Sequence, residues 1–218
     1  MANSTFDLTG KTALVTGGNG GIGLGMAKAL AQSGADICIW GQNEEKNKTA
    51  AEKIAAYGGQ VAAFKCNVSD ENQVEENFAR TVEALGKVDT CFANAGVGSM
   101  GTPFHNMDIS EWRNVFGVNM EGVFFTFRSA IRHMLEREDG GSLVVTSSLS
   151  AKYGMPRGEH YAATKAGVVA IVRGLAVEYA RYRIRANAIL PGWIETDMTA
   201  PLFNIEKFEK NVIPRIPQ

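Results

Sequence analysis

The sequence lacks the features that would attach it to a membrane or a nucleic acid. Its first residues, MANSTFDLTGK, do not have the basic stretch followed by an apolar stretch that marks a signal peptide. No apolar run approaches the roughly 20 residues needed to span a bilayer. The 22 basic and 23 acidic residues nearly cancel, which argues against a polybasic surface. We therefore expect a cytoplasmic protein with neither a nucleic-acid nor a membrane partner.

Cysteine is scarce, and its spacing is not that of a metal site. Cys38, Cys66 and Cys91 form no CxxC pair and lie in apolar, strand-like runs. The three histidines likewise share no metal-ligand spacing. We expect buried free thiols and no bound metal.

Repeats, low-complexity tracts and linkers are also missing, so nothing divides the 218 residues into two units. Instead, short β-branched runs alternate with longer segments of helical period, which is the pattern of βαβ units around a parallel sheet. We predict an α/β fold with a doubly wound parallel sheet, in a single domain over residues 1–218. The predicted strands are 12–16, 36–40, 61–65, 90–93, 142–146 and 185–189, and the predicted helices are 22–33, 44–57, 71–85, 110–136 and 161–179.

Polar residues mark the starts of several predicted helices. Asn43 and Asp70 stand where an N-cap is expected, and Ser110 is predicted to cap the long helix. Gly34 and Gly58 follow helices and suit the left-handed conformation that ends them.

A glycine-rich loop, TGGNGGIG at 16–23, follows the first predicted strand and opens a helix. Glycines let the backbone approach a diphosphate, and the free N–H groups and dipole of the helix start favour its negative charge. Such a turn can be purely structural, but its place at the first βα connection favours a nucleotide site. The predicted contacts are Gly17, Asn19, Gly21, Ile22 and Gly23.

The end of the second strand usually carries the group that distinguishes NAD from NADP: an acid for the ribose hydroxyls or an arginine for the extra phosphate. Here Gly41 and Gln42 hold these positions. Glu44 and Glu45 fall in the next helix, where the helix dipole accounts for them. Because a 2′-phosphate would have no visible cation partner, we expect NAD(H) or NADP(H) with a lean to NAD(H), and we count Gln42 among the cofactor contacts.

Tyr161 and Lys165 are one helical turn apart, so the phenol and the ammonium lie on the same face. A free tyrosine has a pKa of about 10, and a neighbouring cation lowers it. Taken alone, such a tyrosine is more often a packing residue than a catalytic one. Ser148 stands thirteen residues earlier, in a loop that can return to this helix.

Together these motifs resemble the short-chain dehydrogenase/reductase superfamily, in the subgroup with TGxxxGxG and YxxxK motifs. The resemblance covers nearly the whole chain and implies a Rossmann fold and an NAD(P)-dependent oxidoreductase. It rests on TGGNGGIG at 16–23, Asn67-Val68, Asn94-Ala95-Gly96, Asn119, Ser148, Tyr161 with Lys165, and Pro191-Gly192 with Thr196.

The resemblance also implies the catalytic roles. Tyr161 would be the general acid/base, and Lys165 would support it and hold the nicotinamide ribose. Ser148 would steady the substrate oxygen. The backbone of Asn119 would hold a water in a proton relay to the lysine.

Other positions are implied as cofactor contacts. Asn94 would stabilise the central strand, and Gly96 would let the backbone pass close to the adenosine ribose. The segment after the sixth strand would lie against the nicotinamide, with Thr196 bonding its carboxamide. Besides the glycine loop and Gln42, the implied set is Asn67, Val68, Asn94, Ala95, Gly96, Tyr161, Lys165, Pro191, Gly192, Ile194 and Thr196.

The chain departs from the family pattern in two places. Asn67 replaces the usual aspartate that accepts from the adenine amino group; an amide can also accept through its carbonyl, so we expect weaker discrimination. Family members usually continue past Gln218 with a helix and a seventh strand, so we expect a shortened end and a sheet without that strand. Because members commonly pair through the long helix, we also expect a homo-oligomer, a dimer or tetramer.

The predicted function is interconversion of a secondary alcohol and a ketone, a small-molecule substrate, by hydride transfer. The alternative is a non-catalytic, dinucleotide-responsive binding protein on the same fold, which would be expected to have lost Tyr161, Lys165 or Ser148. A methyl-donor-binding enzyme would leave YxxxK unexplained. The motifs do not specify the substrate, and the candidates for an apolar pocket are Tyr153, Met155, Trp193 and Met198.

Overall fold

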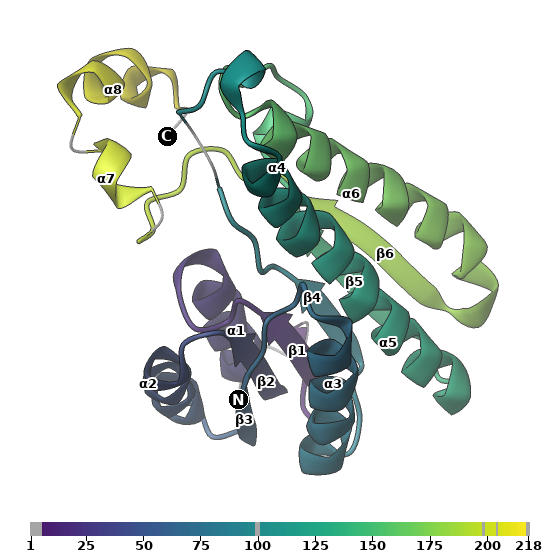
Figure 1. The fold of residues 1–218 in the computed structure, drawn as a ribbon. Helices are drawn as coiled ribbons and strands as arrows, with labels where there is room; N and C mark the ends of the chain where they lie inside the picture. Colours follow the sequence, from purple (N-terminus) through teal and green to yellow (C-terminus); the bar gives the residue numbers. More distant parts are fainter. Residues whose placement is uncertain (1–5, 99–100, 198, 204, 217–218) are drawn as a thin grey trace.

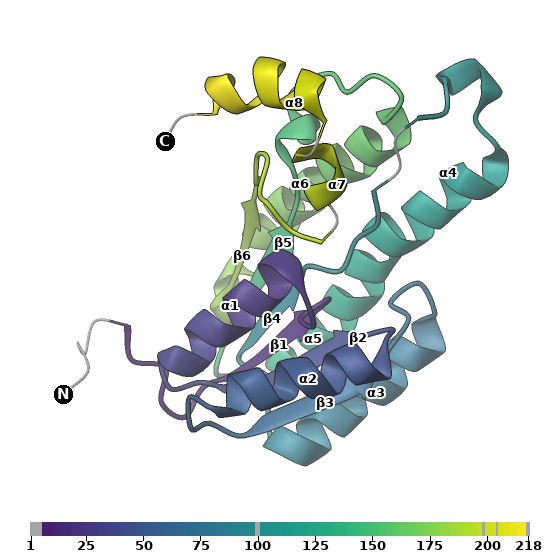
Figure 2. The same ribbon diagram turned by 90° about the vertical axis from the view of Figure 1, so that its left-hand side faces the viewer.

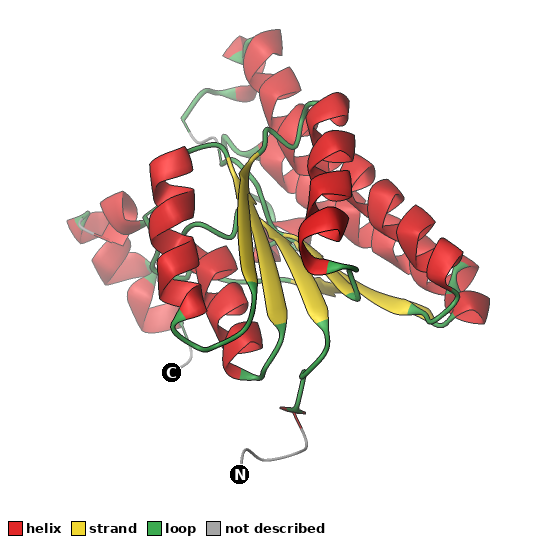
Figure 3. Cartoon of the chain, turned by 90° about the horizontal axis from the view of Figure 1, so that it is seen from below, coloured by secondary structure: helices red, strands yellow, loops and turns green. Residues whose placement is uncertain are grey.

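The computed structural model describes residues 6–98, 101–197, 199–203 and 205–216, in which six strands form one parallel sheet. The strand order is β3-β2-β1-β4-β5-β6, and helices cover both faces (Figures 1 and 3). This is the predicted doubly wound α/β fold, and the described residues contain no seventh strand. The strands are β1 (Thr12–Thr16), β2 (Asp36–Gly41), β3 (Val61–Lys65), β4 (Thr90–Ala93), β5 (Gly141–Thr146) and β6 (Ile184–Ile189).

Each face of the sheet has its own hydrophobic core, because successive strand residues point to opposite faces. Val15 and Ile39 are buried under α1 (Gly21–Gln32) and α2 (Glu44–Ala55), which face the viewer in Figure 2. Leu14 and Cys38 belong to the larger core under α3 (Glu71–Leu85), α5 (Gly122–Arg137) and α6 (Glu159–Glu178). All three cysteines are buried and free, as predicted.

The predicted helix starts are confirmed at two positions and wrong at a third. Asn43 accepts a hydrogen bond from the backbone N–H of Lys46 at 2.9 Å, and Asp70 accepts one from Gln73 at 3.2 Å. Ser110 is not an N-cap. The extended backbone of Asp108 places the cap there, so α4 (Ile109–Phe116) begins before Ser110.

The long helix predicted over 110–136 is not continuous. A π-helical turn, η3 (Gly117–Glu121), separates α4 from α5. Such turns insert an extra residue into a helix and are often found at functional sites. The last predicted helix, 161–179, begins two residues earlier than expected, at Glu159.

Short elements complete the chain. The 3-10 turns are η2 (Phe104–Asn106), η4 (Leu149–Ala151), η5 (Ala180–Tyr182) and η6 (Ile213–Arg215). After β6 come α7 (Ala200–Phe203) and α8 (Glu206–Asn211), which lie beyond the sheet and near the start of α6 in Figures 1 and 2. Within the described ranges, no helix combines the length and the apolar character that crossing a bilayer requires.

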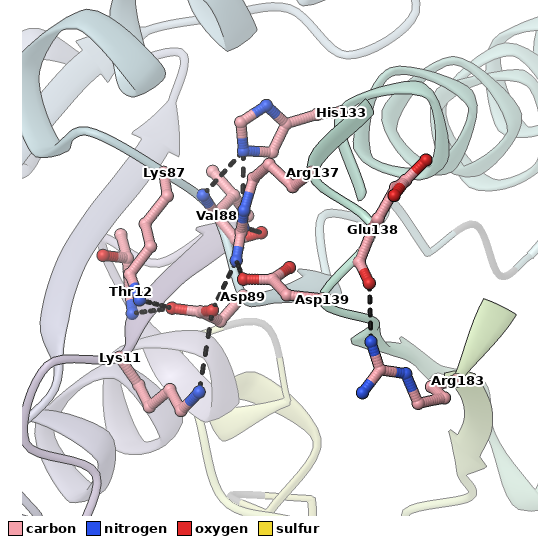
Figure 4. A network of polar contacts seen from close by, with 10 residues as sticks. All are labelled: Lys11, Thr12, Lys87, Val88, Asp89, His133, Arg137, Glu138, Asp139 and Arg183. Carbon is pink, nitrogen blue, oxygen red and sulfur yellow. Dashed lines mark hydrogen bonds and ion pairs between the residues drawn. The ribbon is translucent and has the colours of Figure 1, made fainter. Parts of the chain in front are cut away.

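A polar network joins elements at the amino-terminal edge of the sheet (Figure 4). Asp89 accepts hydrogen bonds from the backbone N–H of Thr12 and from Arg137, both at 2.9 Å. His133 accepts one from the backbone N–H of Val88 at 3.1 Å. These contacts hold the starts of β1 and β4 against the end of α5, at the edge opposite the cavity described next.

Candidate active site

The carboxyl ends of β1, β4, β5 and β6 border one cavity of about 320 Å³. Loops that follow parallel strands meet at this edge, and the first turns of α6 complete the wall. Most of the predicted site residues line it: Gly17, Asn19, Gly21, Ile22, Gly23, Asn94, Ala95, Gly96, Ser148, Tyr161, Lys165, Pro191, Gly192, Ile194 and Thr196.

The glycine loop has the shape of an anion site. Gly17 has a φ of +64°, which favours glycine, and a Cβ at Gly23 would lie 2.3 Å from the carbonyl oxygen of Gly17. Gly20, the N-cap of α1, makes no side-chain capping bond, and the first turn carries no acid. The free N–H groups and dipole at this helix start therefore meet no competing carboxylate from that turn, and the loop fits a pyrophosphate.

Asn94 ties three strand ends together beneath the cavity. Its amide donates to the backbone carbonyl of Thr16 at 3.0 Å, and its carbonyl accepts from the hydroxyl of Thr146, also at 3.0 Å. The hydroxyl of Thr16 accepts in turn from the backbone N–H groups of Asn94 and Ala95. The ends of β1, β4 and β5 are thus held in a fixed relation.

Tyr161 and Lys165 project from α6 toward the loop that follows β5. The ammonium of Lys165 lies 5.6 Å from the centre of the Tyr161 ring, as their spacing predicted. Lys165 donates to the backbone carbonyl of Thr146 at 2.8 Å. Ser148 caps η4 by accepting from the backbone N–H of Ser150. A phenol, an ammonium and a hydroxyl thus face one cavity.

Burial determines the direction in which the pKa values of Tyr161 and Lys165 shift. It raises the pKa of Tyr161, and a hydrogen bond with Ser148 opposes this rise. Burial also lowers the pKa of Lys165 to about 8. The loss of hydration is thus the largest influence on the pKa of Tyr161.

Asn119 is fully buried in the π-helical turn and does not line the cavity. Its side-chain carbonyl accepts from the backbone N–H of Val97 at 2.8 Å, and its amide donates to the Val97 carbonyl at 2.9 Å. A Cβ on Gly96 would lie 3.2 Å from the Asn119 carbonyl oxygen and 3.3 Å from the Lys165 ammonium. Asn119 and Lys165 therefore converge on the backbone of Gly96.

Known proteins are similar to this chain in sequence and in fold. Residues 11–207 match the family model described as short chain dehydrogenase. The chain belongs to the short-chain dehydrogenase/reductase superfamily. It is 37% identical over 195 residues to a 3-oxoacyl-(acyl-carrier-protein) reductase of Chlamydia pneumoniae. The matched region covers 89% of this chain and 78% of that protein.

Solved structures of the superfamily superimpose closely on this chain. A short-chain type dehydrogenase/reductase from Mycobacterium marinum gives a TM-score of 0.91 at 33% identity, covering 97% of this chain and 83% of that one. A 3-ketoacyl-(acyl-carrier-protein) reductase from Brucella melitensis, complexed with NADH, gives a TM-score of 0.85 at 30% identity. The match covers 89% of this chain and 80% of that one. The chain is therefore an NAD(P)-dependent oxidoreductase of this superfamily, acting on alcohol or ketone groups.

Three residues predicted to contact the cofactor lie outside the cavity lining: Gln42, from its place at the end of the second strand, and Asn67 and Val68, through the family resemblance. The amide of Gln42 lies 3.4 Å from the side-chain oxygen of Asn67. That oxygen also accepts from the backbone N–H and hydroxyl of Ser69, at 3.2 and 2.9 Å, so the carbonyl expected to accept from adenine is already engaged. Val68 is buried in the core, where it packs against Gly122.

Sequence reasoning missed several residues of this site. Thr146 and Ser147 hold Lys165 through a backbone carbonyl and a hydroxyl. Thr199 accepts from the backbone N–H of Thr196 at 3.0 Å and donates to the carbonyl of Ile194. The polar run Thr146-Ser147-Ser148 at a strand end was the available signal for the first two.

The four residues predicted as candidates for an apolar pocket do not lie together. Trp193 lines a neighbouring cavity. Tyr153 is 68% exposed, and Met155 packs under Gly158. Met198 lies outside the described residues.

Proposed function

We propose that the chain interconverts a secondary alcohol and a ketone, with Tyr161 as the general acid/base. One observation carries this proposal: Tyr161, Ser148 and Lys165 line the same cavity as the uncapped glycine loop. A proton-transfer group and a dinucleotide cradle are thus within reach of one bound substrate. The nicotinamide, when bound, accepts or supplies the hydride.

The cofactor would lie along the carboxyl edge of the sheet. The glycine loop and the start of α1 would hold its pyrophosphate, and Lys165 would hold the nicotinamide ribose. A Cβ on Gly21 would lie 3.3 Å from Thr196, so the segment from Pro191 to Thr196 reaches the loop. We assign Pro191, Gly192, Ile194 and Thr196, which line the active-site cavity, to the nicotinamide.

Tyr161 would move the proton. Because burial raises its pKa, the phenol is protonated at neutral pH and is ready to donate during ketone reduction. Alcohol oxidation needs the phenolate, which the Lys165 ammonium stabilises while it remains charged. Ser148, hydrogen-bonded to Tyr161, would hold the substrate oxygen. The backbone of Asn119 would hold a water in a proton relay to Lys165.

For the adenosine end we propose contacts with Gln42 and Asn67 and a preference for NAD(H) over NADP(H). Gly41 and Gln42 bring no positive charge to the end of β2. Two nearby lysines already face carboxylates, Lys65 with Glu44 at 3.8 Å and Lys46 with Asp197 at 3.5 Å. Kinetics with both cofactors test this preference, and a more than tenfold preference for NADP would overturn it.

We also propose that the protein is a homo-oligomer that pairs through α5. Phe124 on this helix is 49% exposed, with Arg128 over its ring at 5.1 Å. Members of the superfamily commonly pair through the corresponding helix, and Phe124 would add apolar surface to such a contact. Sedimentation of the protein and of a Phe124→Asp variant would test the assignment, since the variant should shift to monomer.

Tyr161→Phe tests the chemistry. It removes only the hydroxyl, so cofactor binding should persist while turnover falls by about 100-fold or more. Tyr57→Phe, at an exposed tyrosine, is the matched control. Turnover of Tyr161→Phe within tenfold of the parent would overturn the proposal. A parent that binds NAD(H) tightly and turns over none of a broad alcohol and ketone panel would favour the non-catalytic alternative.

A further inference from the structure

A second cavity, of about 460 Å³, adjoins the active-site cavity. Gly192 and Ile194 line both. Leu149, which follows Ser148 directly, lines the second cavity, and a Cβ on Gly192 would lie 3.2 Å from its side chain. The second cavity therefore begins next to the residues that surround the proposed reacting carbon.

The walls of this cavity are apolar. Its lining consists of Leu149, Trp193, Ile194, Val212 and Ile216 together with Gly192 and Asn211. None of these described side chains is charged. A polyol, phosphate or carboxylate entering this space would lose its hydration and find few partners, which costs several kcal/mol per polar group.

Three of the apolar side chains that line this cavity are also partly exposed to solvent. Leu149 is 42% exposed, Trp193 36% and Ile194 46%. Trp193 packs edge-on against Phe208 of α8, with the centres of the two rings 4.8 Å apart. Exposed large apolar residues gathered around a cavity mark a binding site for an apolar group.

We propose that this cavity holds an apolar substituent of the substrate, so that the substrate class is a secondary alcohol or ketone with a hydrophobic chain or ring. The inference rests on the proposed function, because it places the reacting carbon at Tyr161 and the substituent beyond Leu149. Polyols and phosphorylated sugars are then poor substrates.

A homologous series of alcohols tests the inference. Each buried methylene is worth about fourfold in affinity, so kcat/KM should rise at least tenfold from 2-propanol to 2-octanol, and xylitol should be slower than 2-octanol. Trp193→Ala should reduce the 2-octanol advantage at least threefold and leave 2-propanol within threefold of the parent. The matched control is Tyr182→Ala, which removes a 42% exposed aromatic that lines neither cavity.

Tryptophan fluorescence supplies a second readout that needs no turnover. Trp40 is fully buried and Trp112 is stacked on Phe116, whereas Trp193 lines the cavity. Titration with 2-octanol should change the emission saturably, and xylitol should not. Trp193→Phe, which keeps an aromatic ring there, should abolish the change.

The outcomes separate this inference from the function on which it rests. Absence of turnover with every alcohol and ketone removes the proposed function, and the inference about the substrate falls with it. Turnover in which xylitol matches or exceeds 2-octanol, or in which Trp193→Ala leaves the chain-length dependence unchanged, overturns the inference alone. A saturable 2-octanol response that survives in Trp193→Phe would also overturn it, because the site would lie elsewhere.

Discussion

Ser147 donates a hydrogen bond from its hydroxyl to the backbone carbonyl of Lys165 across 2.7 Å. The ammonium of Lys165 donates in the opposite direction, to the backbone carbonyl of Thr146 at 2.8 Å. These two buried bonds join the end of β5 to α6. They fix the loop that carries Ser148 relative to the helix that carries Tyr161.

Ser147→Ala should therefore impair catalysis more than stability. Loss of one intramolecular hydrogen bond costs about 1 kcal/mol of unfolding free energy, while a small displacement of Lys165 should lower kcat/KM by roughly tenfold. Urea denaturation and steady-state kinetics measure the two effects. Ser150→Ala is the control, because the buried Ser150 hydroxyl has no hydrogen-bond partner among the described residues. Equal kinetics for the two variants would contradict a positioning role for Ser147.

Gly96→Ala should disturb the site without disturbing the fold. The added methyl group would approach both the Lys165 ammonium and the Asn119 carbonyl oxygen. Asn119 is held by two bonds to Val97 and the Lys165 ammonium by one to Thr146, so the methyl group displaces a side chain that is fixed beside the cavity. We expect a roughly tenfold loss of kcat/KM and a higher KM for the cofactor.

Gly25→Ala is the matched control for that variant. A Cβ at Gly25 of α1 would meet no atom within 4 Å, and alanine favours a helix interior over glycine by about 1 kcal/mol. The control should be slightly more stable than the parent, with unchanged kinetics. Parent-like kinetics in Gly96→Ala would show that Lys165 accommodates the methyl group.

The strands could be predicted because each is a short, mostly apolar run between turn residues. The bounds of β1, β3 and β4 match residue for residue. The π-helical turn at Gly117–Glu121 could not be predicted, since one extra residue in a helix barely changes its hydrophobic period. Asp108 and Ser110 are both capping residue types, and only the backbone geometry decides between them.

The meeting of Tyr161, Lys165 and Ser148 at one cavity could be predicted, because their side-chain types stand at a recognisable spacing in the sequence. The site could not be predicted where contacts depend on how β5 packs against α6, as for the Ser147 hydroxyl and the Thr146 carbonyl. The pKa of Tyr161 has the same explanation. Sequence spacing places a cation nearby, but it does not report the burial that raises the pKa.

Lys165 should give stability a measurable pH dependence at alkaline pH. Burial lowers its pKa from 10.5 to about 8 in the folded state. Below pH 8 the ammonium is charged in both states, and the burial penalty is present in full. Between these two pKa values the unfolded chain binds a proton that the folded chain does not, so stability rises with pH.

Lys165→Met removes this dependence. The parent's unfolding free energy, relative to that of the variant, should rise by up to about 3 kcal/mol between pH 8 and 10.5. Urea denaturation across that range measures the difference, in which titrations common to both proteins cancel. Lys48→Met, at an exposed lysine, should show no such rise. A constant difference for Lys165→Met would contradict a buried, low-pKa lysine.

His133 should make the fold sensitive to acid from the opposite edge of the sheet (Figure 4). Burial, followed by the charge of Arg137, lowers its pKa, while Glu136, Asp139 and Asp89 oppose the shift. A neutral ring accepts from the backbone N–H of Val88, and a protonated ring cannot. The contribution of the neutral His133 ring to folding stability is complete above the unfolded-state pKa of about 6.5. It is lost as the pH falls below that value, because the unfolded chain then binds a proton that the folded chain does not.

His133→Gln separates this titration from the hydrogen bond, because a glutamine carbonyl can accept from Val88 without binding a proton. Urea midpoints at about pH 7.5 and about pH 5.5 should differ less in this variant than in the parent. His105→Gln, at an exposed histidine in η2, should keep the parent's dependence. If His133→Gln loses as much stability on acidification as the parent does, the acid sensitivity comes from other groups, and His133 serves only as a hydrogen-bond acceptor.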